Sequence, residues 1–383
     1  MDDRNAYMLK GRLARRGYDW WWHSLVAFDR ETGEPQPFFI CYFVINPALG
    51  GPEPVLGQLP EHRRQGIRPA YAMLKAGTWR QNGSVQIHNF YGIDAFAAAT
   101  RPLRVQIGPH LLTDTRLQGE VALTPAAAKA HPEYMSDPGQ MSWDLTAEKV
   151  LGYSVGYGAS ALFRALHAFA MYWHVPGMLT RYTGVIRYNG RLFDVSPETS
   201  AGYQDKNWGQ DFTRLWIWLN CNRLVSRTTG RQPGVTSLVV GGAEPVLWGR
   251  ALPRRLLVAF YYEGRLYEFN FSKFWTLPRQ RASCRSDGDT LTWSLDAWNR
   301  HARIAIRFSS PKTHMQLFHY ENPDGQRRHR QLWNGGWASG TVELYQRSGG
   351  RERLVDIFDG TLAGCEYGEA NVSSPGGANE PCR

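Results

Sequence analysis

The sequence predicts an all-β protein built from antiparallel sheets. Aromatic residues make up 13% of the chain, including 15 Trp, and Gly occurs 39 times. Aromatic side chains suit a pleated surface, and glycines suit its turns and bulges. Apolar and polar residues alternate with period two, without the strand–helix alternation that parallel sheets require. At 383 residues the chain exceeds one ordinary domain, so we expect two.

Two aromatic segments are apolar on both faces. The first, YDWWWHSLVAF, spans residues 18–28, and the second, RLWIWLNCN, spans residues 214–222. A strand covered on both faces lies between its own core and something else, such as a second sheet, a second domain or a ligand cavity. Amides beside the indoles favour the cavity, because ligand pockets are mostly apolar with a few polar groups.

Shorter signals mark helices, strands and hairpins. PAAAKA (125–130) predicts one or two helical turns, and the segment from Ser160 is ambiguous between helix and strand. TLTWSLDAW (290–298) and ARIAIRFSS (302–310) alternate with period two and predict half-buried strands. Gly supplies the positive φ of a tight turn, and it does so in three predicted turns: Asn189-Gly190, Glu263-Gly264 and Asp324-Gly325.

The predicted organisation is two β-domains, residues 15–198 and 199–369, followed by a disordered tail, residues 370–383. The tail is small and polar and lacks the apolar surface that ordering requires. No run of about 18 apolar residues predicts a membrane span, and the N-terminus lacks an apolar secretion signal. We therefore expect a cytoplasmic protein.

The net charge of +10 raises the question of an acidic partner. The basic residues form scattered short clusters without a nucleic-acid-binding motif, so we expect no nucleic-acid partner. Solvated loops are the simplest interpretation of these clusters. The alternative is peripheral contact with an acidic membrane surface. The sequence does not indicate an oligomeric state.

Cofactor signals are missing as well. The five cysteines include no C-x-x-C pair, which argues against a disulfide framework or a zinc site and indicates reduced thiols. The 11 histidines show no metal-ligand spacing, so we expect no metal. No Walker or dinucleotide fingerprint occurs, so we expect no nucleotide.

The segment GYSVG (152–156) matches the G-x-S-x-G nucleophile elbow. In that interpretation the chain is a hydrolase with Ser154 as nucleophile, and His174 or His301 would have to reach it. The elbow needs an apolar strand before it and β/α alternation around it. Long β-hairpins follow instead, so this hypothesis ranks low.

The segment GYQDKNWGQDF (202–212) concentrates polar chemistry inside an otherwise apolar region. If it is extended, Tyr203, Asp205 and Asn207 share one face, whereas Lys206 and Trp208 lie on the other. A carboxylate buried among aromatic side chains loses hydration, which raises its pKa and makes Asp205 a candidate general acid. The structural alternative is that Asp205 caps a turn and Lys206 forms a cross-sheet ion pair.

The segment YQDKNWGQDFTRLWIWLNCN (203–222) resembles the Y-x-E-K-N-W-G…W-x-W-x-x-C-N motif of the tocopherol cyclase family. Asp205 stands where the plant cyclases carry Glu. The similarity covers most of the chain, including IHNFYG (87–92), GVIRYNGRLFDV (184–195) and AGCEYGE (363–369). The motif also resembles the carotenoid 1,2-hydratase and fungal Diels–Alderase relatives, where the middle position is usually His. Lys206 places the chain nearer the cyclases.

The resemblance implies two lipocalin-like antiparallel barrel or sandwich domains that enclose an apolar cavity, and cofactor-free chemistry on a prenylated or polyene substrate. An acid protonates an alkene, and an oxygen traps the resulting cation. The implied catalytic residues are Asp205, Lys206 and Asn207. The implied substrate-binding residues are Trp208, Trp216 and Trp218, which shield the cation, and Asn220 and Asn222, which orient the oxygen. From the residues themselves we expect three more contacts with the substrate: Tyr203 donates a hydrogen bond to a carbonyl, Trp22 lines the cavity wall, and His88 lines the cavity mouth. A solvated turn is the alternative for His88.

Three functional hypotheses remain open from the sequence. The first is a tocopherol-cyclase-like enzyme that drives cyclisation or hydration, with Asp205 as the acid. The second is a non-catalytic carrier of a hydrophobic small molecule, which needs the aromatic walls but not the acid. The third is pericyclic catalysis by cavity shape alone. Glu366, on a late strand, is either one half of a structural ion pair or a second acid in the cavity.

Overall fold

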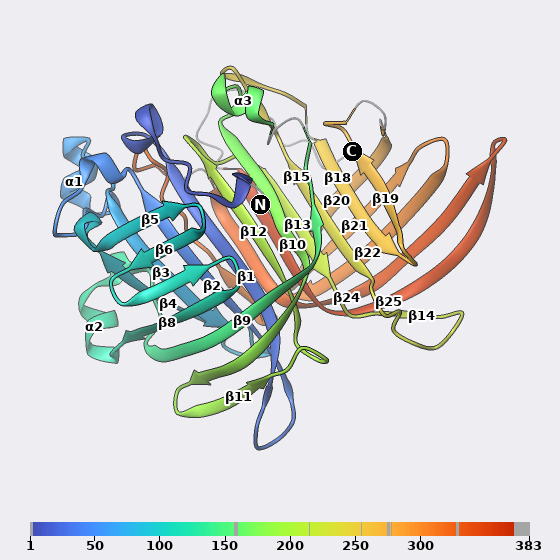
Figure 1. Cartoon of the computed structure of the whole chain (residues 1–383), viewed down its shortest axis with the longest axis horizontal. Coiled ribbons are helices and arrows are strands. Elements are labelled where there is room, and N and C mark those ends of the chain that lie inside the picture. The colour runs from blue at the N-terminus through green and yellow to red at the C-terminus, as the bar shows by residue number, and fades with distance from the viewer. Residues whose placement is uncertain are drawn as a thin grey trace.

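A computed structural model describes residues 3–156, 160–213, 215–253, 255–273, 276, 278–326 and 329–370. Over these residues the fold is all-β, as the sequence predicted. Two antiparallel sheets lie side by side, and a few short helices lie on their periphery (Figure 1). The blue-to-green sheet comes from the N-terminal half of the chain, and the yellow-to-red sheet from the C-terminal half.

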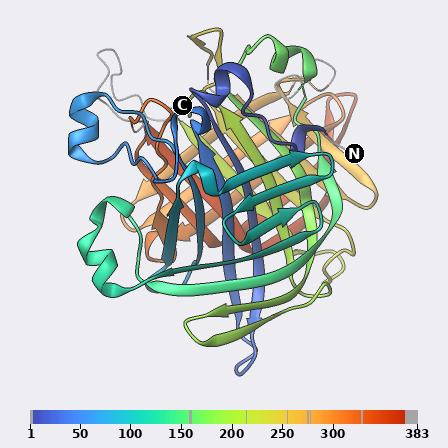
Figure 2. The ribbon, with the colours of Figure 1, turned by 60° about the vertical axis from the view of Figure 1, so that its left-hand side comes forward.

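The first sheet contains twelve strands: β1 (Tyr18–Asp29), β2 (Pro35–Ile45), β3 (Tyr71–Thr78), β4 (Val85–Tyr91), β5 (Phe96–Thr100), β6 (Leu103–Ile107), β7 (His110–Thr113), β8 (Arg116–Leu123), β9 (Gly139–Tyr153), β10 (Met171–Tyr188), β11 (Arg191–Val195) and β12 (Ala201–Gly209). Their order is β4-β3-β2-β1-β11-β10-β9-β8-β7-β6-β5, and β12 pairs with β1 and β10. The sheet curves back on itself (Figure 2), so that Tyr42 Oη on β2 donates to the Leu111 carbonyl on β7 at 3.0 Å.

The second sheet contains eleven strands: β13 (Trp216–Cys221), β14 (Leu224–Ser226), β15 (Ser237–Ala243), β18 (Arg255–Tyr262), β19 (Arg265–Asn270), β20 (Arg279–Asp287), β21 (Thr290–Trp298), β22 (Ala302–Pro311), β23 (Met315–Leu317), β24 (His329–Ser348) and β25 (Arg351–Ala370). Their order is β19-β18-β15-β13-β25-β24-β22-β21-β20, with β14 paired to β25 and β23 to β24. A separate hairpin joins β16 (Val246–Leu247) to β17 (Arg250–Ala251).

In the part of the chain that the structure describes, three short α-helices lie outside the sheets: α1 (Pro60–Gln65), α2 (Pro125–Ala130) and α3 (Ala161–Ala165). Helix α2 is the predicted one, and its N-cap Thr124 accepts a hydrogen bond from the backbone of Ala127. The ambiguous segment from Ser160 splits into α3 and the start of β10. Helix α1 was not predicted. Single 3₁₀ turns occur at Asp3–Asn5, Gly11–Ala14, Pro47–Leu49, Ile93–Ala95, Pro132–Tyr134 and Lys312–His314. Within the described ranges, no helix has the length and apolar character needed to cross a membrane.

The predicted turns form, but not all of them join paired strands. Asn189-Gly190 connects β10 to β11, and Glu263-Gly264 connects β18 to β19; all four residues have positive φ. Asp324-Gly325 also forms a turn, closed by hydrogen bonds between Asn322 and its neighbours. This turn lies in the irregular segment between β23 and β24. The sequence therefore predicted the turn correctly, but the expectation that it joins two paired strands was wrong.

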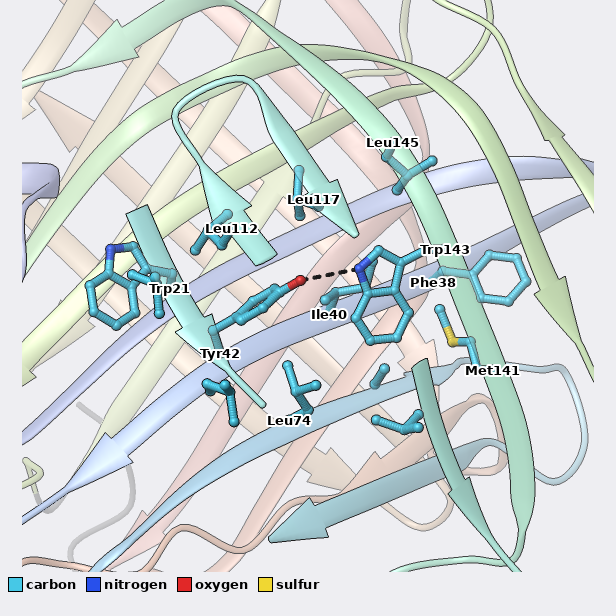
Figure 3. Packing of buried hydrophobic residues seen from close by; sticks show 14 of the residues in the cluster. Trp21, Phe38, Ile40, Tyr42, Leu74, Leu112, Leu117, Met141, Trp143 and Leu145 are labelled. Atoms are coloured by element: carbon cyan, nitrogen blue, oxygen red, sulfur yellow. Dashed lines mark hydrogen bonds between the residues drawn. The ribbon is translucent and has the colours of Figure 1, made fainter. Parts of the chain in front are cut away.

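Each sheet covers a hydrophobic core on its concave side. In the first sheet Trp21, Tyr42 and Trp143 belong to this core, and Trp143 Nε1 donates to Tyr42 Oη at 3.3 Å (Figure 3). The second core gathers residues such as Leu219, Trp293 and Phe358. Because side chains alternate along a strand, the next residues along these strands project between the two sheets.

The sheets divide between Gly209 and Trp216, which is later in the chain than the predicted domain boundary at residues 198 and 199. The reason is that β12 pairs with β1 and β10 and so completes the first sheet. Of the predicted tail, Ala370 is the last residue of β25, and residues 371–383 lie outside the described residues.

Candidate functional site

A layer of mostly aromatic side chains fills the space between the two sheets. We call it the inter-sheet layer; its buried members are Tyr18, Trp20, Trp22, Phe39, Cys41, Phe43, Ile45, Leu56, Tyr71, Met73, Trp79, Tyr153, Val155, Trp173, Val175, Met178, Tyr203, Phe212, Trp216, Trp218, Val239, Leu257, Ala259, Phe318 and Leu332. Both doubly apolar segments of the sequence contribute to it, which explains their lack of a polar face.

The pleat of β12 sends the polar motif in two directions. Tyr203, Asp205 and Asn207 project into the inter-sheet layer, where Tyr203 packs on Trp218 with ring centroids 5.1 Å apart. Asp205 pairs in register with Trp22 of β1. The predicted face assignment therefore holds, and it brings Tyr203, Asp205 and Asn207 together with Trp22, Trp216 and Trp218.

The Asp205 carboxyl group is buried and bound asymmetrically. Its Oδ2 accepts from Trp173 Nε1 at 3.0 Å and from Tyr203 Oη at 3.2 Å, whereas Oδ1 has a longer contact of 3.4 Å with Asn207 Nδ2. Burial raises the pKa of Asp205 to about 7, although these hydrogen bonds favour the carboxylate and oppose the shift. At neutral pH a substantial fraction of Asp205 is protonated.

A second carboxyl group, Glu366 on β25, faces the same layer from the second sheet. It accepts hydrogen bonds from Trp216 Nε1 and, at 3.2 Å, from Asn334 Nδ2. Burial raises the pKa of Glu366 to about 7, and the charge of Asp205 contributes to the shift. The indoles of Trp173 and Trp216, which bind the two carboxyl groups, meet edge-to-face with centroids 6.4 Å apart.

Several buried polar atoms in or beside the inter-sheet layer have no hydrogen-bond partner among the described residues. Each such atom costs roughly 1–3 kcal/mol of desolvation free energy. Groups of this kind in a native protein call for an explanation, and a bound ligand is one of them. They are Tyr18 Oη, Lys75 Nζ, Asn207 Oδ1, Trp218 Nε1 and Asn334 Oδ1.

An apolar pocket of about 110 Å³ opens beside this site. Trp173 and Trp216 form part of its wall together with Gly241, where a Cβ atom would lie 2.2 Å from the Trp173 ring. Ligand pockets usually measure about 300–1,000 Å³. The pocket is therefore smaller than a lipid-sized ligand requires when the aromatic side chains keep these positions.

Two predicted site residues, Lys206 and Trp208, lie on the opposite face of β12, away from Asp205. Lys206 is fully buried, forms an ion pair with Asp19 and lies 3.8 Å from the centroid of the Trp21 ring. Trp208 stacks on Tyr172 with centroids 5.4 Å apart. The prediction that these two residues contact a substrate next to Asp205 is corrected: successive side chains of a strand point to opposite faces of the sheet, so Lys206 and Trp208 point away from Asp205.

The remaining predicted residues lie at the margins. Asn220 Nδ2 donates to the Leu238 carbonyl at 3.0 Å, and Asn222 Nδ2 donates to the Gly202 carbonyl at 2.8 Å. These amides tie main-chain segments together, whereas their predicted task was to orient a substrate oxygen. His88, on β4, binds the Tyr134 carbonyl through Nδ1 at 2.9 Å, and burial holds the pKa of His88 well below its usual value.

The structure also locates the residues of the other motifs. Ser154 follows the end of β9, and α3 begins only at Ala161, so Ser154 does not occupy a strand-to-helix elbow in the described part of the chain. Its Oγ accepts from Arg4 Nη1 at 2.6 Å. Across the described ranges, no group of three or more His, Cys, Asp or Glu side chains is arranged to hold a metal ion.

Sequence reasoning missed Trp173, Asn334 and Lys75. Nothing in the local pattern marks Trp173 or Asn334, because their importance arises from contacts with distant carboxyl groups. Lys75 did leave a signal: it is a single charge inside the apolar run YAMLKAG (71–77). A buried charge in the middle of a strand is rare enough to suggest a function.

Comparison with known proteins agrees with the motif. The model of the tocopherol cyclase-like family matches residues 66–369. The chain belongs to this family. It is 26% identical over 141 residues to a probable chloroplastic tocopherol cyclase of Oryza sativa subsp. japonica, covering 36% of this chain and 29% of that protein. It is 27% identical over 131 residues to the chloroplastic tocopherol cyclase of Zea mays, covering 33% and 26%. The match thus spans less than a third of these curated relatives.

Solved structures that resemble this one include an AttH-like protein from Nitrosomonas europaea. It has a TM-score of 0.44 and 11% identity, and the match covers 95% of this chain and 95% of that one. Kievitone hydratase from Nectria haematococca has a TM-score of 0.43 and 12% identity, covering 91% of this chain and 88% of that one. In this chain, the range that matches the family model, residues 66–369, contains Lys75, Asp205 and Glu366.

Proposed function

We propose that this protein is an enzyme that protonates an alkene of a lipophilic prenylated or polyene substrate and so drives cyclisation or hydration. The observation that carries the proposal is the Asp205 carboxyl group, which is buried among aromatic side chains and bound by Trp173 and Tyr203, so that burial raises its pKa to about 7. The chemistry of the curated relatives, which are tocopherol cyclases, supports the same assignment.

Asp205 Oδ1 is the oxygen suited to carry the transferable proton, because Oδ2 already accepts two hydrogen bonds. The alkene π electrons form the new C–H bond with this proton, which leaves a carbocation on the neighbouring carbon and a carboxylate on Asp205. The indoles of Trp173, Trp216 and Trp218 line the layer and stabilise a cation through their π faces by about 0.5–2 kcal/mol each.

A substrate hydroxyl closes a ring, or a water molecule gives an alcohol, when its oxygen bonds to the cation and loses a proton. The Asp205 carboxylate takes up this proton directly or through Glu366, which restores the acid. Asn207 Oδ1, buried and without a donor among the described residues, is placed to accept a hydrogen bond from the attacking hydroxyl before its proton is lost.

Turnover should decrease as the pH rises through about 7, because the acid form of Asp205 is lost above its pKa of about 7. Burial and the charge of Asp205 raise the pKa of Glu366 to about 7, so the titration of one carboxyl group influences that of the other. Trp173→Phe removes a hydrogen-bond donor that lowers the pKa of Asp205, so the decrease in turnover should occur at a higher pH in this variant. Profiles of kcat/KM against pH for the wild type and Trp173→Phe measure both effects. A wild-type profile without a decrease around neutrality contradicts the assignment of Asp205 as the acid.

The substrate can be identified directly from the purified protein. Mass spectrometry of hydrophobic molecules that copurify with the protein should find a prenylated or polyene compound. Incubation of that compound with the enzyme should yield an isomer of the same mass if the reaction is cyclisation, or a product heavier by one water if it is hydration. A bound compound that returns unchanged favours the carrier hypothesis.

We also propose that the substrate arrives from an acidic membrane surface at the end of the molecule formed by α3 and the β16–β17 hairpin. Leu162, Leu166 and Trp248 are 66%, 53% and 64% exposed there, and the Trp248 amide donates to the Ala168 carbonyl. A cleft of about 1050 Å³ adjoins them; it is lined by Trp248, by the basic residues Arg12, Arg16 and Arg63, and by the acidic residues Asp211, Glu244 and Asp324. The exposed apolar side chains favour insertion into a lipid surface, and the arginines favour contact with anionic head groups.

Trp248→Ser combined with Leu162→Ser should weaken binding to phosphatidylglycerol vesicles by about ten-fold or more, since each large apolar side chain contributes about 1.5–3 kcal/mol when buried. Co-sedimentation measures this binding. Leu354→Ser, at an exposed position of β25, is the matched control and should bind like the wild type. Equal binding by all three proteins contradicts a membrane-contacting role for this end.

A further inference from the structure

Lys75 is a fully buried lysine that points between the two sheets. Its neighbours Leu74 and Ala76 belong to the core of the first sheet, so the Lys75 side chain projects to the other side. There its Nζ lies 3.3 Å from the centroid of the Phe318 ring and 4.6 Å from that of Tyr320. Both rings come from the segment after β23 in the second sheet, so the amine is enclosed by both halves of the molecule.

The Lys75 amine has no hydrogen-bond acceptor among the described residues. The other lysine that the structure buries completely, Lys206, forms an ion pair with Asp19. Burial lowers the pKa of Lys75 to about 7, and the charges of Cys41 and Glu366 only partly offset this effect. A buried amine held only by aromatic faces destabilises the fold, so it requires an explanation other than stability.

Lys75 lies in the same transverse row of side chains as Asp205. Across neighbouring strands Asp205 pairs with Trp22, Trp22 with Cys41, and Cys41 with Lys75. Residues in register on antiparallel strands project from the same face of the sheet. Since strands are about 4.8 Å apart, the Asp205 and Lys75 Cα atoms lie about 14 Å apart. The row thus has a carboxyl group at one end and an amine toward the other.

Aromatic rings connect these two groups within the inter-sheet layer. Tyr320, which contacts the amine, packs on Trp20 with centroids 4.8 Å apart. Burial raises the pKa of Tyr320, and the charges of Glu366, Cys41 and Asp205 raise it further, so these groups lie within electrostatic reach of one another. The layer between Asp205 and Lys75 is therefore apolar in its middle and polar at both ends.

We propose that Lys75 binds the acidic oxygen of an amphiphilic substrate, a phenol or a carboxylic acid, whose alkene lies several bonds away at Asp205. This inference deepens the proposed function and rests on it for the role of Asp205. The Lys75 amine donates hydrogen bonds to the oxygen and balances its negative charge, while the aromatic rings hold the hydrocarbon. Lys75 is thus a positioning residue that selects acidic substrates over neutral ones of the same shape.

Equilibrium binding of matched probes tests the proposal independently of turnover. Farnesoic acid and farnesol differ only in the head group, as do geranylhydroquinone and its dimethyl ether. Isothermal titration calorimetry of the wild type should show at least about ten-fold tighter binding of the acidic member in one pair or both, as expected for a charge-assisted hydrogen bond. Lys75→Met should abolish this preference and leave the affinity for the neutral member within about three-fold.

The thermal midpoint separates positioning from a structural role. Lys75→Met removes a buried charge without a hydrogen-bond partner and should leave Tm unchanged or raised, whereas loss of a structural contact would lower it. Lys75→Gln, a shorter uncharged variant, should show the same loss of preference and provides a second test if Lys75→Met does not fold. Lys129→Met, at an exposed position of α2, controls for the change in net charge.

Three results would overturn the inference: a wild type that does not prefer either acidic probe, including one that binds neither; a preference that persists in both Lys75 variants; or a lowered Tm in both variants, which would indicate a structural role. None of these results bears on Asp205, since no turnover is measured. Conversely, an active Asp205→Asn variant would remove the proposed function while a Lys75-dependent preference for acidic ligands remained. The two failures are therefore distinguishable.

Discussion

Asp205→Asn should reduce turnover by about 10²–10⁴-fold, the usual contribution of a positioned general acid. The substitution keeps the size of the side chain and leaves an oxygen that can accept from Trp173 and Tyr203, but it removes the transferable proton. Affinity for the copurifying compound should change by less than about three-fold, because binding of the substrate in its ground state does not require the transferable proton of Asp205. Steady-state kinetics and calorimetric titration with that compound measure the two effects.

Thermal unfolding provides the folding control for this variant. The pKa of Asp205 is higher in the folded protein than the ordinary aspartate value of 3.8, so the folded state binds more protons and loses stability as the pH rises from about 4 toward 7. Asn cannot ionise. Above neutral pH Asp205→Asn should therefore unfold at the same temperature as the wild type or higher. A stable variant with undiminished turnover would eliminate Asp205 as the acid and favour catalysis by cavity shape alone.

Lys206→Met should destabilise the protein by about 3–5 kcal/mol, because removal of one partner leaves an uncompensated buried charge. Asp19 and Lys206 are both fully buried. After the substitution Asp19 keeps a hydrogen bond from the Met8 amide at 2.8 Å but loses its cation. The rings of Trp21 and Trp208 also lose their contact with the ammonium group. Urea unfolding of the purified variant measures the change in the free energy of unfolding.

Two further variants test the cause of that loss. Asp19→Leu combined with Lys206→Met replaces the ion pair by apolar groups and should recover most of the stability, as buried pairs often allow. Arg30→Met breaks an exposed ion pair: the side chains of Arg30 and Asp194 are 48% and 51% exposed. This substitution should lower the free energy of unfolding by less than about 1 kcal/mol. A similar small cost for Lys206→Met would show that the buried pair does not stabilise the fold.

The contrast between Lys206 and Lys75 shows how far sequence reasoning reached. The polar motif directed attention to Lys206, and its alternation correctly separated Lys206 from Asp205. A cross-sheet ion pair was the structural alternative for Lys206, and the structure shows such a pair with Asp19. Lys75 escaped notice because a single lysine in an apolar strand reveals neither which face it uses nor what covers that face.

Glu366 illustrates a second limit. The sequence left open whether it forms an ion pair or serves as a second acid, and the structure places it opposite Asp205 with hydrogen bonds from Trp216 and Asn334. These partners are 150 and 32 residues away along the chain. Strand pairing over such separations follows from the register of whole sheets, which local patterns do not specify.

The all-β class, the antiparallel strands, the two main hairpins and the family all follow from the sequence, because period-two alternation, Gly turns and the motif at residues 203–222 are local properties of the chain. Only the tertiary structure determines that the two aromatic faces pack against each other, where β12 joins the first sheet, and which charged groups lose their water. The physical reason is that a pKa, and therefore an acid or a ligand-binding amine, depends on desolvation by residues distant in sequence.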